Sequence, residues 1–492
     1  MIHRLPRALA AAGLGASAVV ALLVFLHLIG PGATLDMIGE RPGVMRGFYP
    51  AEETPEGLTF QWTRQSADVR LDGADRRVDW IAIVRLRGGR PDPSTLPEVT
   101  FSIGGVVSRR VRSGNDFQDV VVPIPAEARG ERGFTLLITT SNTFVPGPGD
   151  PRELGVVVDR IKIMPAAGAT VLPPRRALAG ATGAVALLGA ALGLIGLTLG
   201  TAVLAAVLIA LGHALAVCRD VGPYSPYALQ VIWIAVWIAV ALVAEVWGIE
   251  RALGRALRGT ARFVAAFTAG AIYLKLLILL HPALPVGDAV FQAHRFEWVL
   301  AGRFFFTSLA PGLYEFPYAI GFYLFSAPFS WTTRNDVALL RIVAACVDAL
   351  AGVLLYSMIV RSWGNRLAGA MATAVYHLIP LNFAVQTVGN LTNAFAQSVA
   401  VMAIYGVTSG TLRVEHRGIT ILVTLVTLGA FLSHTSTLAI LFTTMIAVAL
   451  LFWLRGGPAL ASAAQAVTIV AIGGLTIAIL IYHPHFGAVY RQ

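Results

Sequence analysis

A polar segment near the middle of the chain holds the residues that could do chemistry. Residues 280–303 read LHPALPVGDAVFQAHRFEWVLAGR, directly after a long apolar run. One carboxylate, Asp288, stands at the start, followed by His294, Arg295, Glu297 and Arg303. A carboxylate at a membrane edge can act as a general base, or hold a metal ion or an acceptor hydroxyl. Arginines behind it can bind lipid phosphates.

The same residues also have a purely structural interpretation. "VGDAVFQ" is a good start for a helix, and Asp288 could simply cap it. If helical, residues 289–305 carry aromatic side chains at amphipathic spacing, with Phe291 and Trp298 turned toward the membrane. Such a helix lies in the interface plane, where its arginines can anchor it at headgroup depth. Both interpretations stay open at this point.

Composition identifies the environment of this segment. The chain has 492 residues, of which 56% are hydrophobic and 13% are charged, whereas soluble domains carry roughly 25% charged residues. A multi-pass membrane protein in the lipid bilayer is predicted. The formal charge of +10 reflects arginines that flank apolar segments, as the positive-inside rule requires. We therefore predict no nucleic-acid partner, and we expect neither a disulfide nor a metal site from Cys218 and Cys346.

The chain divides into four parts. Residues 1–30 form an apolar run behind Arg4 and Arg7, which predicts a membrane anchor with a cytoplasmic N-terminus rather than a cleaved signal peptide. Residues 31–172 are polar and rich in Gly and Pro. Residues 173–262 supply additional transmembrane helices, and residues 263–492 form a second transmembrane module with a candidate active-site loop over 282–312.

Alternating hydrophobicity characterises the polar part. In "RRVDWIAIVRLRG" every second residue from Val78 to Leu86 is apolar, and Phe134, Leu136 and Ile138 share one face of a second run. Several such runs separated by turn residues predict a jelly-roll-like antiparallel β-sandwich. It follows a helix that starts in the cytoplasm, so we expect it to be extracytoplasmic. Trp62 and Trp80 are candidate sugar platforms, although alternation places both on apolar faces and favours core packing.

Charge also orients the second module. A cluster of four arginines lies within "ERALGRALRGTAR", at positions 251, 255, 258 and 262, and should be cytoplasmic. The span over 263–281 then exits on the outer side, which makes Asp288 extracytoplasmic. Apolar runs predict about 11–13 spans in the whole chain. The run over 313–330 contains prolines and could be re-entrant, or an additional short crossing could lie near 289–306.

Other polar residues could also belong to the site. Lys275 lies inside an apolar span and is a candidate phosphate ligand, or a side chain that reaches the headgroups. Arg341 and Asp348 share a helix face and could pair or tie neighbouring helices together. The remaining residues could line the site or make hydrogen bonds between helices: Glu315, Asn390, Asn393, His434, His483 and His485.

Three segments resemble the C-type membrane glycosyltransferases, which include protein O-mannosyltransferases and aminoarabinose transferases. "HPALPVGDAVFQAHRFEWVLAGR" matches the family's extracytoplasmic loop with an essential Asp, and "PGLYEFPYAIGFYLFSAPF" its Pro/Tyr-rich lead into the next span. "RNDVALLRIVAACVDALAGVLLYSMIVRSWGNRLAGAMATAVYHLIP" matches the spans that follow. The resemblance covers roughly residues 263–410. It departs in lacking a second acid beside Asp288, for which Glu297 and Glu315 are the nearest candidates.

The resemblance implies a function. The donor would be a sugar on a polyprenyl phosphate, and the acceptor a glycan or a lipid-linked molecule outside the cytoplasmic membrane of a bacterium. Asp288 would be the general base of an inverting single displacement, and Arg295, Arg303 and Lys275 would hold the donor phosphate. The family also leaves room for a divalent metal ion, whose presence the sequence does not decide.

Two other functions remain open. A transporter or flippase of a lipid-linked saccharide would use a similar groove, but it predicts paired internal repeats, and none is evident in the sequence. A non-catalytic cell-envelope assembly subunit predicts that Asp288 tolerates replacement. A glycine-rich nucleotide loop is absent from the sequence, which is consistent with a lipid-linked rather than a nucleotide-linked donor.

Overall fold

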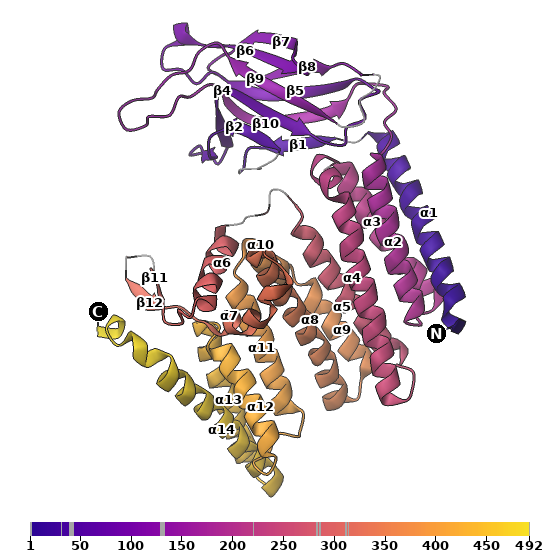
Figure 1. The fold of residues 1–492 in the computed structure, drawn as a ribbon, viewed down its shortest axis with the longest axis vertical. Coiled ribbons are helices and arrows are strands. Elements are labelled where there is room, and N and C mark those ends of the chain that lie inside the picture. The colour runs from indigo at the N-terminus through magenta and orange to yellow at the C-terminus, as the bar shows by residue number, and fades with distance from the viewer. Residues whose placement is uncertain are drawn as a thin grey trace. The chain divides into compact units, whose positions relative to one another are not determined.

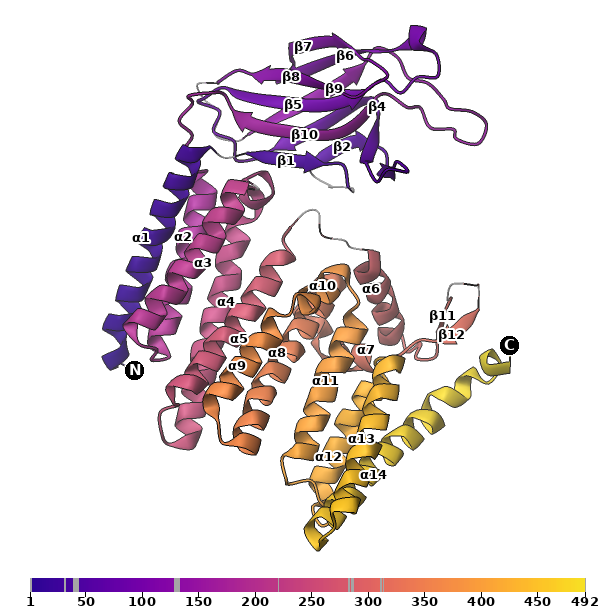
Figure 2. The same ribbon diagram turned by 180° about the vertical axis from the view of Figure 1, so that it is seen from behind.

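A computed structural model describes residues 2–30, 32–38, 44–127, 133–219, 221–281, 284, 287–309, 312 and 314–491. The chain forms two compact units (Figures 1 and 2). The first comprises Met1–Trp247 with Leu280–Ala283, and the second comprises Gly248–Leu279 with Leu284–Gln492. Each unit has its own core.

Three helices of the first unit pack through small residues: α1 (Leu5–Ile29), α2 (Arg175–Leu194) and α3 (Leu199–Arg219). A Cβ on Gly15 would lie 2.9 Å from side chains of α2 and α3, and one on Gly189 would lie 2.9 Å from the backbone of Ala11. Small residues of this kind let the backbones of membrane helices approach closely. The predicted anchor over 1–30 is therefore α1, packed as part of a helix bundle. The long helix α4 (Val221–Leu253) follows.

Ten strands form a barrel-like antiparallel sheet between α1 and α2. The strands are β1 (Ala33–Asp36), β2 (Met45–Phe48), β3 (Glu52–Glu53), β4 (Thr59–Leu71), β5 (Trp80–Arg87), β6 (Glu98–Ile103), β7 (Val106–Arg112), β8 (Gln118–Ile124), β9 (Phe134–Thr140) and β10 (Val157–Pro165). One half has the order β1-β10-β5-β8 and the other β4-β9-β6-β7, with β2 and β3 also paired to β4. Pairing of Trp62 with Val157 joins the halves. Along the chain, most successive strands pass from one half of the sheet to the other, as they do in a jelly roll.

The alternation predicted from the sequence is confirmed in this domain. Residues of β5 are buried at every second position from Trp80 to Leu86, and Phe134, Leu136 and Ile138 are buried on β9. Trp80 is 1% exposed, and its indole N–H donates to the backbone oxygen of Asp75 at 2.8 Å. Trp80 is thus a core residue and cannot serve as a sugar platform. Trp62 is half-buried, with its ring edge against Phe144.

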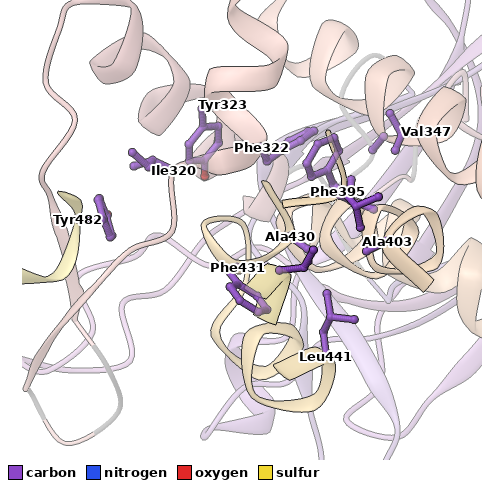
Figure 3. Packing of buried hydrophobic residues seen from close by; sticks show 14 of the residues in the cluster. Ile320, Phe322, Tyr323, Val347, Phe395, Ala403, Ala430, Phe431, Leu441 and Tyr482 are labelled. Carbon is purple, nitrogen blue, oxygen red and sulfur yellow. The ribbon is translucent and has the colours of Figure 1, made fainter. Parts of the chain in front are cut away.

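The second unit is helical. Its elements are α5 (Gly259–Ile278), α6 (Gly287–Leu300), β11 (Thr307–Leu309), β12 (Glu315–Pro317), α7 (Gly321–Ser326), α8 (Asp336–Trp363), α9 (Arg366–Leu378), α10 (Pro380–Val388), α11 (Leu391–Thr408), α12 (Arg417–Phe431), α13 (Thr435–Arg455) and α14 (Pro458–Ile481). Figure 3 shows the buried apolar cluster of this unit, in which Phe322 of α7 meets Phe395 of α11 at a ring distance of 5.0 Å. The short helix α7 is therefore held inside the bundle.

Ten helices in the described part of the chain are long and apolar enough to cross a membrane, counting α9 and α10 as one, and α12 is a shorter apolar helix. Ten is one below the predicted range of about 11–13, because α12 has only 15 residues and falls short of a span. The apolar run over 313–330 is not one helix: its described residues form β12, the six-residue α7 and a 3-10 turn over Ala327–Thr332. Pro317 and Pro328 break the run because proline disrupts a helix interior. The segment near 289–306 holds the 14-residue α6, too short to span.

Candidate functional site

The candidate site is built on α6, which buries one face. Its buried residues recur at helical spacing: Ala289, Gln292, Ala293, Phe296 and Val299. The helix ends at a glycine with positive φ, Gly302 (φ 78°), and the N–H of Arg303 closes the turn by donating to the oxygen of Trp298 at 2.8 Å. The predicted helix is therefore present. Phe291 and Trp298, which were predicted to face the membrane, lie half-buried on the flank of this helix.

Asp288 is exposed in the first turn of α6, where a negative charge interacts favourably with the helix dipole. The next residue, Ala289, is fully buried against the end of α10. A Cβ on Gly389 (φ 97°) would lie 2.7 Å from the backbone nitrogen of Ala289, so only glycine fits there. This contact brings the turn between α10 and α11, with exposed Asn390, beside the start of α6. Asp288 and Asn390, predicted separately, thus flank one backbone contact.

Arg295 is held by aromatic rings. Its guanidinium carbon lies 4.0 Å from the ring centre of Trp298, 4.7 Å from that of Phe291 and 5.5 Å from that of Phe306. Among the described residues none forms a hydrogen bond or an ion pair with this side chain, and its buried Nε has no partner. Burial lowers the pKa of Arg295, while the nearby Tyr323 and Tyr318 act to raise it. Arginine stays protonated regardless, so this is a cation that no acid in the described part of the chain compensates.

Gln292 fixes α6 to the rest of the second unit. Its amide nitrogen donates to the hydroxyl oxygen of Tyr318 at 3.1 Å, and its amide oxygen accepts from the hydroxyl of Tyr323. The hydroxyl of Tyr482 in turn donates to the backbone oxygen of Tyr318. Burial raises the pKa of the Tyr323 phenol, which therefore remains a hydrogen-bond donor. This network explains how a short polar helix is held in one position beside the bundle.

Lys275 has a different environment from the one predicted for a phosphate ligand. It is 3% exposed on α5, and its ammonium forms an ion pair with Asp348 of α8. The second carboxylate oxygen of Asp348 accepts from the hydroxyl of Tyr376 at 2.7 Å. The structure thus places Lys275 inside helix packing with its charge compensated. Asp348 ties helices together, and Arg341 likewise donates to the backbone oxygen of Thr387.

The other predicted residues fall into two groups. His294, Glu297 and Arg303 are exposed on or just after α6. Near them, Glu315 accepts a hydrogen bond from Thr307 across the β11–β12 hairpin, and the ring of His485 stacks on Phe305 at 3.6 Å. His483 lies in the same 3-10 turn as His485. His434 precedes α13, and Asn393 accepts from Gln397 within α11, so the structure does not connect these two to α6.

Several residues of this site were not predicted from the sequence. Gln292 is the main one, and its signal was available: it occupies the apolar stripe of α6, where a polar residue must find partners. Tyr318 and Tyr323 lie far along the chain and gave no local signal. Within the described residues there is no group of three or more His, Cys, Asp or Glu arranged to hold a metal ion.

No family model matches the chain, and no curated protein matches it. The function is therefore inferred from the geometry of α6 and its surroundings.

Proposed function

We propose that this chain is an integral-membrane glycosyltransferase. It transfers a sugar from a polyprenyl-phosphate donor to a glycan or lipid-linked acceptor, on the outer side of a bacterial cytoplasmic membrane. The β-domain and α6 stand on that side in the topology indicated by the four arginines over 251–262. The resemblance over 263–410 suggested this chemistry, and the environment of Arg295 supports it.

The observation that carries the proposal is the pairing of an open acid with an uncompensated cation on one helix. Asp288 and Arg295 are seven residues apart on α6, so they share a face, roughly 10 Å apart along the axis. A phosphate bound at Arg295 would complete the missing charge pair of that side chain. The sugar would then extend along the helix toward Asp288, which is open to an acceptor from the aqueous side.

The reaction follows from these positions. Asp288 takes the proton of the acceptor hydroxyl as that oxygen attacks the anomeric carbon of the sugar. The bond between this carbon and the phosphate oxygen breaks on the opposite face, and the configuration at the anomeric carbon inverts. The departing polyprenyl phosphate carries the electron pair, and Arg295 stabilises its charge. The proton leaves Asp288 to solvent.

The β-domain supplies a candidate surface for a glycan acceptor. A hollow of about 450 Å³ is lined by polar groups from four strands and the turn between β6 and β7, among them Arg46, Asp68, Ser102 and Thr135. Hydroxyl, carboxylate and guanidinium groups of this kind form hydrogen bonds with sugar hydroxyls. Asp68→Ala should weaken binding of the glycan acceptor and leave binding of the lipid-linked donor unchanged.

The test is sugar transfer by the purified full-length protein from a polyprenyl-phosphate sugar, compared with Asp288→Asn. Removing a general base typically lowers the rate on the order of 10²–10⁴-fold. Asn preserves the shape and much of the helix-start interaction, so folding should be little changed. Asp116→Asn is the control, since Asp116 is an exposed carboxylate of the β-domain that does not belong to the proposed site. It should transfer sugar like the wild type.

The rival functions give other results in the same assay. A flippase would move the lipid-linked sugar across a vesicle bilayer without forming a glycosidic product. An assembly subunit would show neither activity, and cells would tolerate Asp288→Asn. Transfer at the wild-type rate by purified Asp288→Asn would show that this residue only begins a helix. Repeating the assay with a chelator decides whether a divalent ion takes part.

A further inference from the structure

The side chain of Tyr318 lies beside the cation at Arg295. Tyr318 directly follows β12, and its ring centre lies 5.4 Å from that of Phe291 and 6.2 Å from that of Phe306. The same two rings hold the guanidinium of Arg295, at 4.7 Å and 5.5 Å. Tyr318 is close enough that it acts to raise the pKa of Arg295. It is half-buried, so a ligand bound at Arg295 can also reach the phenol.

The hydrogen-bond pattern around Tyr318 leaves its own hydroxyl hydrogen available. The phenol oxygen accepts from the amide nitrogen of Gln292 at 3.1 Å, and the amide oxygen accepts from the hydroxyl of Tyr323. As this amide is oriented, Tyr318 acts toward Gln292 only as an acceptor. The hydrogen of a hydroxyl group rotates to suit its partner. It can face the nearby phenol of Tyr323, but a phosphate oxygen is a stronger acceptor because it is charged.

Two backbone hydrogen bonds hold Tyr318 in place. Its N–H donates to the oxygen of Phe306 at 3.1 Å, and its oxygen accepts from the hydroxyl of Tyr482. Tyr482 follows α14 directly and is 3% exposed. In the turn after it, the ring of His485 stacks on Phe305 at 3.6 Å. The last turn of the chain is thus fastened to the segment that carries Tyr318.

We propose that Tyr318 is a second ligand of the phosphate group bound at Arg295. Its hydroxyl donates to one phosphate oxygen, and the guanidinium of Arg295 donates to others. Tyr482 is a positioning residue, which acts on the phosphate only through Tyr318. The phenol adds direction, because the rings around Arg295 offer no hydrogen bond to an anion. The role of Tyr318 rests on the proposed transferase function, which supplies the phosphate.

The test is the affinity of the purified full-length protein for polyprenyl phosphate, measured beside its affinity for the corresponding polyprenol. Tyr318→Phe removes only the hydroxyl and should weaken binding of the phosphate about 10- to 100-fold, the contribution of a hydrogen bond to a charged group. Binding of the alcohol should change little, because it has no phosphate. Tyr314→Phe is the matched control, since Tyr314 is an exposed tyrosine of the same segment, and it should bind both ligands like the wild type.

A double variant tests the positioning role of Tyr482. Tyr482→Phe keeps the ring and loses the hydrogen bond to the backbone of Tyr318, so phosphate binding should weaken, though less than in Tyr318→Phe. In a Tyr318→Phe background the same change should have no further effect on binding, because the hydroxyl it positions is already absent. Losses in affinity that simply add would contradict this role.

The results distinguish a failure at Tyr318 from a failure of the proposed function. If Tyr318→Phe binds polyprenyl phosphate like the wild type while Arg295→Met does not, Tyr318 is no ligand and the donor site at Arg295 stands. Equal losses of phosphate and alcohol binding in Tyr318→Phe would also refute the contact. A wild-type protein that binds no polyprenyl phosphate would overturn both proposals. Equal displacement by phosphatidylglycerol would assign the phosphate to bilayer phospholipid and overturn the donor assignment.

Discussion

Two cations of the second unit are held in contrasting ways. Lys275 is buried between α5, α8 and α9 with Asp348 as its counter-ion and Tyr376 behind it. Arg295 lies against three aromatic rings and has no acid partner among the described residues. A buried pair has its charge compensated inside the protein, whereas a cation over aromatic rings still attracts an anion. Lys275 therefore stabilises the fold, whereas Arg295 is available for a ligand.

The largest expected effect comes from breaking the compensated pair. Asp348→Ala leaves the Lys275 ammonium buried without a partner, which typically costs about 3–5 kcal/mol of folding free energy. Thermal denaturation in detergent measures the loss. The double variant Lys275→Met with Asp348→Leu removes both charges and should recover most of the stability. If Asp348→Ala alone is as stable as the wild type, the pair is not the structural element described here.

Removal of the uncompensated cation should spare stability and reduce binding. Arg295→Met keeps an unbranched side chain against the rings, so the melting temperature should fall little. Binding of polyprenyl phosphate should weaken by about 1.5–3 kcal/mol, the contribution of a hydrogen bond to a charged group. Arg303→Met should have a smaller effect because that side chain is exposed and lacks the aromatic support. A clear fall in melting temperature of Arg295→Met, with donor binding unchanged, would show instead that Arg295 serves the fold.

Cysteine labelling tests whether α6, which carries Arg295, and the turn after α4 face the sides assigned to them. In a background with Cys218 and Cys346 replaced, a cysteine at exposed His294 should react with an impermeant reagent from outside. A cysteine at Gly254, an open turn position after α4, should react only after permeabilisation. Ala289 is unsuitable as a probe because it is fully buried against Gly389. The opposite pattern would place α6 in the cytoplasm and remove a lipid-linked donor on the outer side.

The smallest effect is expected for an acid–arginine pair that is partly solvated. Asp75 with Arg77 is such a pair, because the arginine side chain is 50% exposed. The contact with Arg77 lowers the pKa of the Asp75 carboxyl in the folded protein. The pair therefore stabilises the fold fully at pH values above the unfolded pKa of about 3.9, and this contribution is lost as the pH falls through the folded pKa. Asp75→Asn should therefore cost about 1 kcal/mol at neutral pH. The gap in melting temperature between wild type and variant should narrow in acid; a constant gap would mean that charge is not its origin.

Periodicity in the sequence predicted those parts of the fold that depend on local pattern. The alternation over Trp80–Leu86 gave the buried face of β5, and long apolar runs gave the helices α1 to α5. The prolines in the run over 313–330 already indicated a re-entrant segment as one alternative, and Pro317 and Pro328 lie where the structure divides this run into β12, α7 and a 3-10 turn. The packing of α6 against the bundle could not be predicted, since it depends on the close approach of Gly389 to Ala289, a hundred residues earlier in the chain.

The site was predictable only in part for the same reason. Asp288 and Arg295 stood out by type and spacing within one segment. The counter-ion of Lys275 could not be read from the sequence, because Asp348 lies on another helix. The partners of Gln292 are likewise set by tertiary packing, through Tyr318 and Tyr323.

Photolabelling with a polyprenyl phosphate that carries a photoreactive group beside the phosphate tests whether the donor phosphate binds at Arg295. Labelled peptides are located by mass spectrometry in the full-length protein, with excess phosphatidylglycerol present to occupy sites for ordinary lipids. We expect labels within Gly287–Leu300 and the β11–β12 hairpin, lost in Arg295→Met and kept in Lys275→Met with Asp348→Leu. Labels confined to α5, α8 and α9, or unchanged in Arg295→Met, would contradict it.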